Sequence, residues 1–100
     1  MSKKIVTSTT SFSELRKNFD WVLSLIDKGK VIEVTEKRHP IAYLFKIAAE
    51  SDVQIKAQYD EVYLRRNFFE VFQKIEKPES SPIQINRFEK PPIVISSQLN

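Results

Sequence analysis

The side chains best suited to chemistry lie at the start of an expected helix, in the stretch SFSELRKNFD at positions 11–20. Ser11, Ser13, Arg16, Lys17 and Asn18 cluster there. The free amides and positive dipole end of a helix N-terminus attract phosphate. Arginine suits bidentate contact with guanine or phosphate, and asparagine suits adenine. These five residues are candidate nucleic-acid contacts, although a polar first turn is also ordinary in a solvated helix.

A second basic group stands at an expected hairpin tip, where Lys37 and Arg38 precede His39. Residues 1–47 hold nine Lys and Arg against five Asp and Glu, while the rest of the chain holds seven against eight. An uneven charge distribution of this kind predicts a polyanion partner at the front, and a chance split is the alternative. Lys37 and Arg38 are therefore further candidate DNA contacts, which in a dimer would form two symmetric basic patches.

The sequence contains few of the residues that enzymes use for catalysis. The chain has no cysteine, a single histidine and a single glycine, so it lacks a thiol nucleophile and a glycine-rich phosphate loop. His39 has no second histidine or cysteine with which to share a metal ion, and its place before Pro40 favours a surface turn. We expect no catalytic residues, no metal site, no cofactor and no enzyme activity.

The apolar runs are short. None approaches the ~20 residues of a membrane span, and MSKKIVT is too polar for a signal peptide. The sequence therefore predicts a cytoplasmic protein with no membrane partner.

The front half predicts a strand, a helix and a β-hairpin. Residues 4–7 are β-prone, and a helix begins where Ser11 and Glu14 form a capping box. It ends at Gly29, which tolerates the left-handed conformation of a helix C-terminus. Residues 31–35 and 41–47 then read as paired strands. A domain of ~50 residues buries too little surface alone, so we expect a homodimer.

Two apolar side chains do not fit the buried stripe of this helix. Trp21 and Leu25 fall on nearly the opposite side from Phe12, Leu15 and Phe19. Either the helix is kinked near residues 18–20, or this second side packs on another copy of the chain. Under the second interpretation Trp21 and Leu25 are the candidate dimer contacts.

The rear half predicts a long helix followed by extended chain. Asp52 is a suitable cap for a helix that runs to about Lys74 and carries two apolar stripes. Residues 77–82 have the composition of a linker, and residues 82–86 and 91–96 are apolar snippets bracketed by prolines. We expect these snippets to add as strands to a partner's sheet, the alternative being a disordered terminus.

These features resemble the prevent-host-death (Phd/YefM) antitoxins of bacterial toxin–antitoxin modules. The first matching stretch is SFSELRKNF at positions 11–19. GKVIEVT at 29–35 and HPIAYL at 39–44 match the second part in order and spacing. Two positions depart from the family pattern. Glu36 stands in place of an arginine, and Arg38 stands in place of a glycine, so we expect a hairpin turn of different shape.

The resemblance implies an antitoxin. Its homodimeric front domain would bind double-stranded operator DNA and repress its own operon, with Arg16 as a DNA contact. Its rear half would wrap and neutralise a cognate protein toxin. The candidate toxin contacts are the apolar side chains of the second helix stripe and the extended snippets: Leu64, Phe68, Phe72, Ile83, Ile85, Phe88, Ile93 and Ile95.

The expected architecture is thus an α+β fold. It has a small Phd/YefM-like dimerising and DNA-binding domain (1–50), a long helix that links to the partner-binding region (51–76), and an extended toxin-binding tail (77–100). A protein-interaction module that has lost DNA binding is the alternative function, favoured by Glu36. A ribbon-helix-helix repressor would need a helix after Gly29, where the β-branched run favours a strand.

Overall fold

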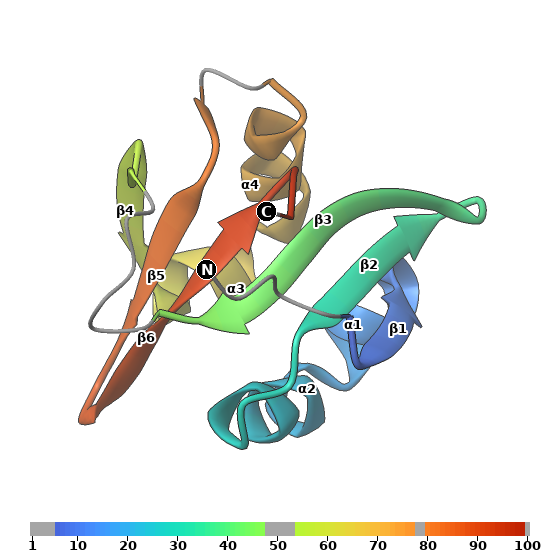
Figure 1. Cartoon of the computed structure of the whole chain (residues 1–100). Coiled ribbons are helices and arrows are strands. Elements are labelled where there is room, and N and C mark those ends of the chain that lie inside the picture. The colour runs from blue at the N-terminus through green and yellow to red at the C-terminus, as the bar shows by residue number, and fades with distance from the viewer. Residues whose placement is uncertain (1–5, 48–53, 78–79, 100) are drawn as a thin grey trace.

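A single six-stranded sheet carries four short helices (Figure 1). The structure, a computed structural model, describes residues 6–47, 54–77 and 80–99. In chain order the elements are β1 (Ser8–Ser11), α1 (Phe12–Lys17), α2 (Phe19–Asp27), β2 (Ile32–Glu36), β3 (His39–Lys46), β4 (Ala57–Asp60), α3 (Glu61–Arg66), α4 (Phe68–Ile75), β5 (Ile83–Arg87) and β6 (Lys90–Ser96).

The same succession of strand, two helices and two strands occurs twice. We call residues 8–46 the first repeat and residues 57–96 the second repeat. The strand order β1-β2-β3-β6-β5-β4 runs outward from the central antiparallel pair of β3 and β6. In each repeat the first strand lies parallel to the second, and the second lies antiparallel to the third. The two repeats are therefore related by an approximate two-fold axis between β3 and β6.

The repeats share a local sequence that explains their shared helices. Residues 15–19 read LRKNF and residues 64–68 read LRRNF. In both, the asparagine leaves the helical conformation, with φ −120° at Asn18 and φ −135° at Asn67, and a second helix begins. The preceding helices are capped alike, because Ser11 accepts from the Glu14 amide and Asp60 from the Tyr63 amide. Each helix pair is thus broken by its own asparagine.

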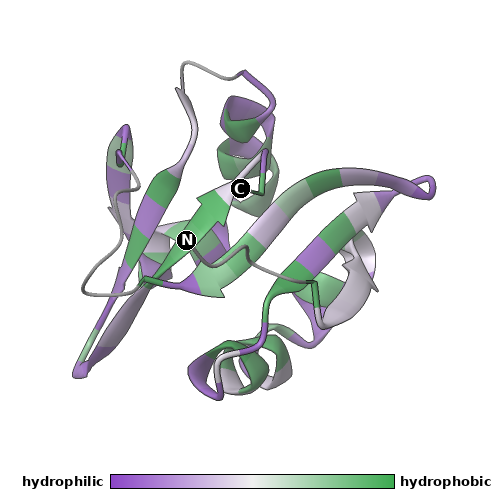
Figure 2. Ribbon diagram, in the orientation of Figure 1, coloured by the Kyte–Doolittle hydropathy of each residue, from purple (hydrophilic) through white to green (hydrophobic). Residues whose placement is uncertain are grey.

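All four helices contribute to one apolar core against one face of the sheet. Alternate residues of the strands belong to this core, including Ile32, Val34, Ile83 and Ile85. Figure 2 shows hydrophobic residues alternating with hydrophilic ones along strands such as β5. The opposite face carries a smaller cluster that includes Phe45. The helices therefore form one layer and the sheet the other.

Aromatic side chains join the repeats inside this core. The Phe12 ring lies 5.0 Å from that of Phe72, and the Phe19 ring lies 5.0 Å from that of Phe68, both edge to face. Such pairs add to the free energy gained from apolar burial. The helix layer of one repeat is consequently packed on that of the other.

A buried ion pair also joins the repeats. The Arg87 guanidinium, at the end of β5, is 2% exposed and donates to the Asp27 carboxylate of α2 at 2.5 and 3.3 Å. It also donates to the Pro91 carbonyl at 2.7 and 2.9 Å. The hydrogen bond from Arg87 lowers the pKa of Asp27, burial opposes that shift, and the positive charges of Arg87, Lys90 and Lys46 add to it.

The prediction of a long helix followed by an extended tail is wrong. Residues 57–60 pair with β5 as a strand, and the helical part is divided at Asn67 into α3 and α4. The proline-bracketed snippets are strands, but they pair with β3, with β4 and with each other within this chain. The second repeat thus completes the sheet of the first repeat within one chain. The predicted cap Asp52 lies outside the described residues.

Two details of the front half also differ from expectation. The first strand described covers Ser8–Ser11, where the hydroxyl residues pair in parallel with β2, and the residues Val6 and Thr7 precede it. Residues 1–5 lie outside the described part. At the hairpin between β2 and β3, Lys37 and Arg38 take φ +53° and +69°. Arg38 therefore adopts the left-handed conformation that favours glycine, at the position where we expected a turn of different shape.

Candidate nucleic-acid interface

Four basic side chains stand at equivalent places in the two repeats. Arg16 and Lys17 end α1, and Arg65 and Arg66 end α3. Each pair precedes the asparagine that breaks its helix, so the repeat itself determines where the four side chains lie. All four are exposed. We call these four residues the junction cations.

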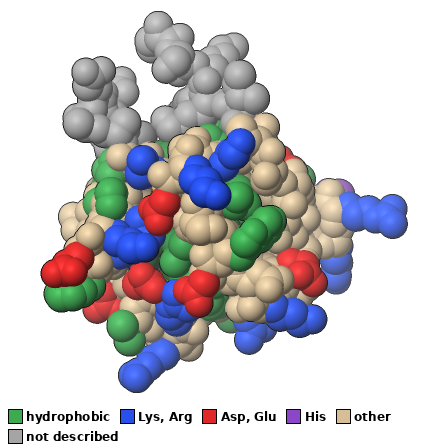
Figure 3. All heavy atoms as spheres, turned by 90° about the horizontal axis from the view of Figure 1, so that it is seen from below, with side chains coloured by type: hydrophobic (Ala, Val, Ile, Leu, Met, Phe, Trp, Pro, Cys, Tyr) green, Lys and Arg blue, Asp and Glu red, His purple; other side chains and the backbone are tan. Residues whose placement is uncertain are grey.

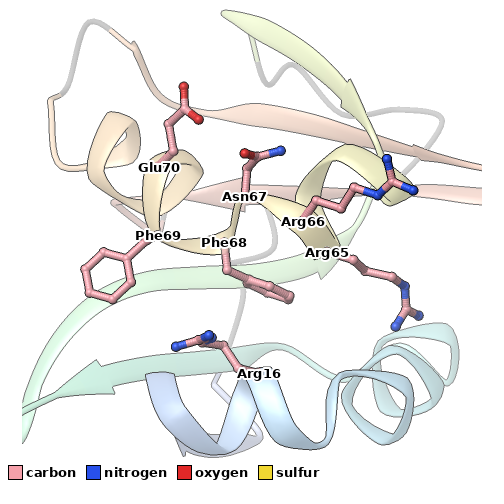
Figure 4. Close-up of a pocket in the computed structure, with 7 residues that line it drawn as sticks. All are labelled: Arg16, Arg65, Arg66, Asn67, Phe68, Phe69 and Glu70. Atoms are coloured by element: carbon pink, nitrogen blue, oxygen red, sulfur yellow. The ribbon is translucent and has the colours of Figure 1, made fainter.

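The two-fold arrangement brings the junction cations of both repeats together. Arg16 and Arg65 line two shallow hollows of about 250 and 460 Å³, with Phe68 between them. Arg66 lines the smaller hollow and Lys17 the larger one. Figure 4 shows Arg16 rising from α1 toward Phe68, with Arg65 and Arg66 extending from α3 above it. One surface therefore combines basic side chains from both halves of the chain.

The Arg65 side chain already forms ion pairs with two carboxylates. Its guanidinium lies 2.5 Å from the Asp20 carboxylate and 2.7 Å from that of Glu61. It also lies 4.9 Å from the centre of the Phe19 ring. Burial alone lowers the pKa of Arg65, but the hydrogen bonds to Asp20 and Glu61 raise it above the ordinary value. Two carboxylates thus bind the Nε and Nη2 groups of this guanidinium.

The other three junction cations differ from Arg65. Within the part of the chain that the structure describes, Arg16, Lys17 and Arg66 form no ion pair with an acidic side chain. Figure 3 shows one face of the molecule on which basic and acidic side chains are interspersed. That face therefore presents both signs of charge and not a uniform positive field.

The remaining predicted DNA contacts are divided between two places. Ser11 caps α1, Ser13 is exposed beside it with its Oγ 3.3 Å from that of Ser11, and Asn18 donates to Glu14. Ser13 lines the larger hollow with Arg16 and Lys17. The hairpin residues Lys37 and Arg38 are exposed but line neither hollow. The structure therefore brings together the helix residues, and the hairpin tip stands apart.

The predicted dimer contacts have different environments. Trp21 is 62% exposed on α2, whereas Leu25 is half-buried against the core. The break at Asn18 gives the kink that was one of the two explanations for this second apolar side.

Most of the predicted toxin contacts are interior residues. Phe88 is 88% exposed at the turn between β5 and β6. The others lie in the core because both helices of the second repeat and its strands β5 and β6 pack inward: Leu64, Phe68, Phe72, Ile83, Ile85, Ile93 and Ile95. They hold the sheet and helices together in this fold, and Phe68 also lines the two hollows.

Sequence reasoning missed Arg65 and Arg66. The signal was the second copy of the Leu-Arg-basic-Asn-Phe pattern at residues 64–68, which places two more basic side chains at the equivalent helix end. The sequence-based prediction of one long helix with two apolar stripes covers this stretch and does not include the internal repeat.

Neither a metal centre nor a membrane span is found in residues 6–47, 54–77 and 80–99. No three His, Asp or Glu side chains are grouped there as metal ligands would be, and no helix is long and apolar enough to cross a bilayer. Comparisons with protein-family models, with curated proteins and with solved structures find no match to this chain. The function must therefore be argued from the surface itself.

Proposed function

We propose that this protein is a cytoplasmic, double-stranded-DNA-binding repressor of the Phd/YefM kind, in which one chain supplies both halves of the DNA-binding unit. The observation that carries the proposal is the meeting of Arg16 and Lys17 with Arg65 and Arg66 across the approximate two-fold axis. Paired basic side chains related by a two-fold axis suit the two-fold symmetry of a DNA duplex.

The chemistry of these side chains supports phosphate contact. Arginine presents a planar fork of donors to a phosphate, and lysine adds a point charge. Three of the four junction cations are exposed and form no ion pair among the described residues, so an approaching phosphate need not displace a carboxylate from them. The exposed cations at Lys37 and Arg38 would add contacts farther along the duplex.

Toxin binding, if the protein is an antitoxin, would need a surface other than the one expected from the sequence. The segment expected to wrap a toxin forms the second repeat, and its apolar side chains are buried. The proposal therefore rests on DNA binding. A cognate toxin remains a proposed partner, to be tested by co-expression with the product of the adjacent reading frame.

The test is fluorescence anisotropy with a labelled duplex from the region upstream of the protein's own reading frame. Arg16→Ala with Lys17→Ala removes two phosphate contacts. We expect at least about tenfold weaker binding and a salt slope smaller by about 2. Lys30→Ala is the matched control, because Lys30 is exposed but lines neither hollow. Equal losses in the Lys30 control and the double variant would refute the proposed surface.

A protein-interaction module is the second candidate, and one observation favours it. Trp21 remains 62% exposed on α2, which is unusual for a large aromatic side chain. Under this alternative Trp21→Ala abolishes binding to a protein partner, whereas the parent protein fails to bind duplex DNA at 0.15 M salt.

A further inference from the structure

The two repeats are unequal at the one position where their arginines correspond. Arg16 and Arg65 follow Leu15 and Leu64 in the shared pattern, and both line the same hollows. Arg16 forms no ion pair among the described residues, whereas Arg65 is bonded to Asp20 and Glu61. A two-fold arrangement alone would give both arginines the same partners, so the difference comes from the acidic residues.

The sequence explains why only Arg65 is bonded in this way. Asp20 follows the shared pattern in the first repeat, and Phe69 follows it in the second. The Asp20 carboxylate reaches across the junction to the arginine of the other repeat, whereas Phe69 offers no carboxylate to Arg16. The Phe69 ring instead lies 5.5 Å from the Phe12 ring.

The contact between Asp20 and Arg65 is also poorly explained as a stabilising ion pair. The Asp20 side chain is 86% exposed and that of Arg65 is 37% exposed. Exposed pairs contribute little to folding stability because water and salt screen them. Glu61 already holds Arg65 from within α3, through contacts at 2.7 and 2.8 Å. Asp20 is therefore a second carboxylate on a guanidinium that has one.

We infer that Asp20 acts as an intramolecular substitute for a DNA phosphate, which occupies Arg65 and restricts DNA contact at the junction to Arg16, Lys17 and Arg66. This inference rests on the proposed DNA-binding function and adds to it a residue that weakens binding. Asp20 adds a negative charge beside the hollow and holds the Arg65 guanidinium, and both effects oppose a phosphate there. The first repeat then supplies the stronger half of the DNA contact.

The experiment measures the affinity and salt dependence of the upstream duplex for the parent protein and for Asp20→Asn. The variant keeps the size of the side chain but removes its charge. We expect about fivefold tighter binding at 0.1 M salt and a slope of log K against log salt that is steeper by about 1, which corresponds to one added phosphate contact.

Glu70→Gln is the matched control for charge alone. Glu70 lines the smaller hollow and lies 3.6 Å from Lys74, but it does not contact Arg65. We expect it to tighten binding less than Asp20→Asn and to leave the salt slope unchanged. In an Arg65→Ala background, Asp20→Asn should give no more gain than Glu70→Gln does.

Three outcomes would overturn the inference. The first is an unchanged or lower affinity in Asp20→Asn together with a lower melting temperature, as for a purely structural ion pair. The second is a gain of the same size when Arg65 is absent. In both, the parent protein still binds DNA through Arg16, so the proposed function stands. The third is the absence of salt-sensitive DNA binding by the parent and the variant alike, which ends the proposed function and the inference with it.

Discussion

Replacing Arg87 with methionine should strongly destabilise the fold, because it removes the one buried ion pair that joins the repeats in the described residues. Arg87 is 2% exposed and makes two contacts to Asp27 and two to the Pro91 carbonyl. Breaking a buried pair by removing one partner costs about 3–5 kcal/mol. Since Asp27 is 30% exposed and keeps some water, we expect the lower end, about 3 kcal/mol.

The assay is urea denaturation followed by circular dichroism, together with a thermal melt. A loss of about 3 kcal/mol lowers the melting temperature of a chain of this size by about 12 °C. The control is Asp27→Asn, alone and combined with Arg87→Met. The double variant should lose less than the sum of the two single losses, by about 2 kcal/mol, because the partners interact directly. Additive losses, or a loss below about 1 kcal/mol in Arg87→Met, would refute this reasoning.

The same pair predicts the direction of the acid response. The hydrogen bond from Arg87 lowers the pKa of Asp27 below its ordinary value of 3.8. A carboxyl whose pKa is lower in the folded state stabilises the fold above its unfolded pKa, and that contribution is lost as the pH falls through the folded pKa. The free energy of unfolding should therefore decrease below about pH 4 in the parent, and decrease less steeply in Arg87→Met.

Two further predictions concern packing and strain. Phe68→Ala should lower the free energy of unfolding by about 3–5 kcal/mol, because Phe68 packs on the Phe19 ring across the repeats. Phe69→Ala, at a 59% exposed position, should lower it by less than about 1 kcal/mol. Similar losses in the two variants, measured by chemical denaturation, would contradict the assigned core. Arg38→Gly should raise the free energy of unfolding by about 1 kcal/mol, because φ is +69° there, and an unchanged midpoint would show that the turn carries no strain.

Much of the first repeat could be predicted from the sequence because its signals are local. The cap at Ser11, the buried positions Phe12, Leu15 and Phe19, and the hairpin strands all follow from spacing within a few residues. The limit on the size of a lone small domain was also a sound argument, since the first repeat completes a larger sheet. The second half of the same chain supplies the strands that complete this sheet, and the homodimer stays a prediction.

The second repeat could not be predicted in this way because its pairing is long-range. Residues 57–60 form a strand only because β5, more than twenty residues later, offers its edge in parallel. From the sequence alone the apolar residues of β5 and β6 have no sheet to join, because β4 lies within the stretch predicted to be one long helix. Asn67 breaks that helix at the position that Asn18 occupies in the first repeat, so comparison of the two stretches would have indicated the break.

The candidate site was predicted in part for the same reason. Arg16, Lys17 and Asn18 were found from residue type and position at a helix end, which need no knowledge of the fold. Their pairing with Arg65 and Arg66, and the carboxylates that occupy Arg65, depend on the two-fold arrangement of the repeats.

The most direct test of the central claim is the salt dependence of DNA binding by the parent protein. Its affinity for the upstream duplex is measured by fluorescence anisotropy between about 0.05 and 0.3 M salt. This range brackets the physiological ionic strength of about 0.15 M. If Arg16, Lys17 and Arg66 each contact a phosphate, log K should fall against log salt with a slope of about −3, and with a slope of about −4.5 if Lys37 and Arg38 add two further contacts. A slope near zero, or no binding at 0.05 M salt, would contradict the account.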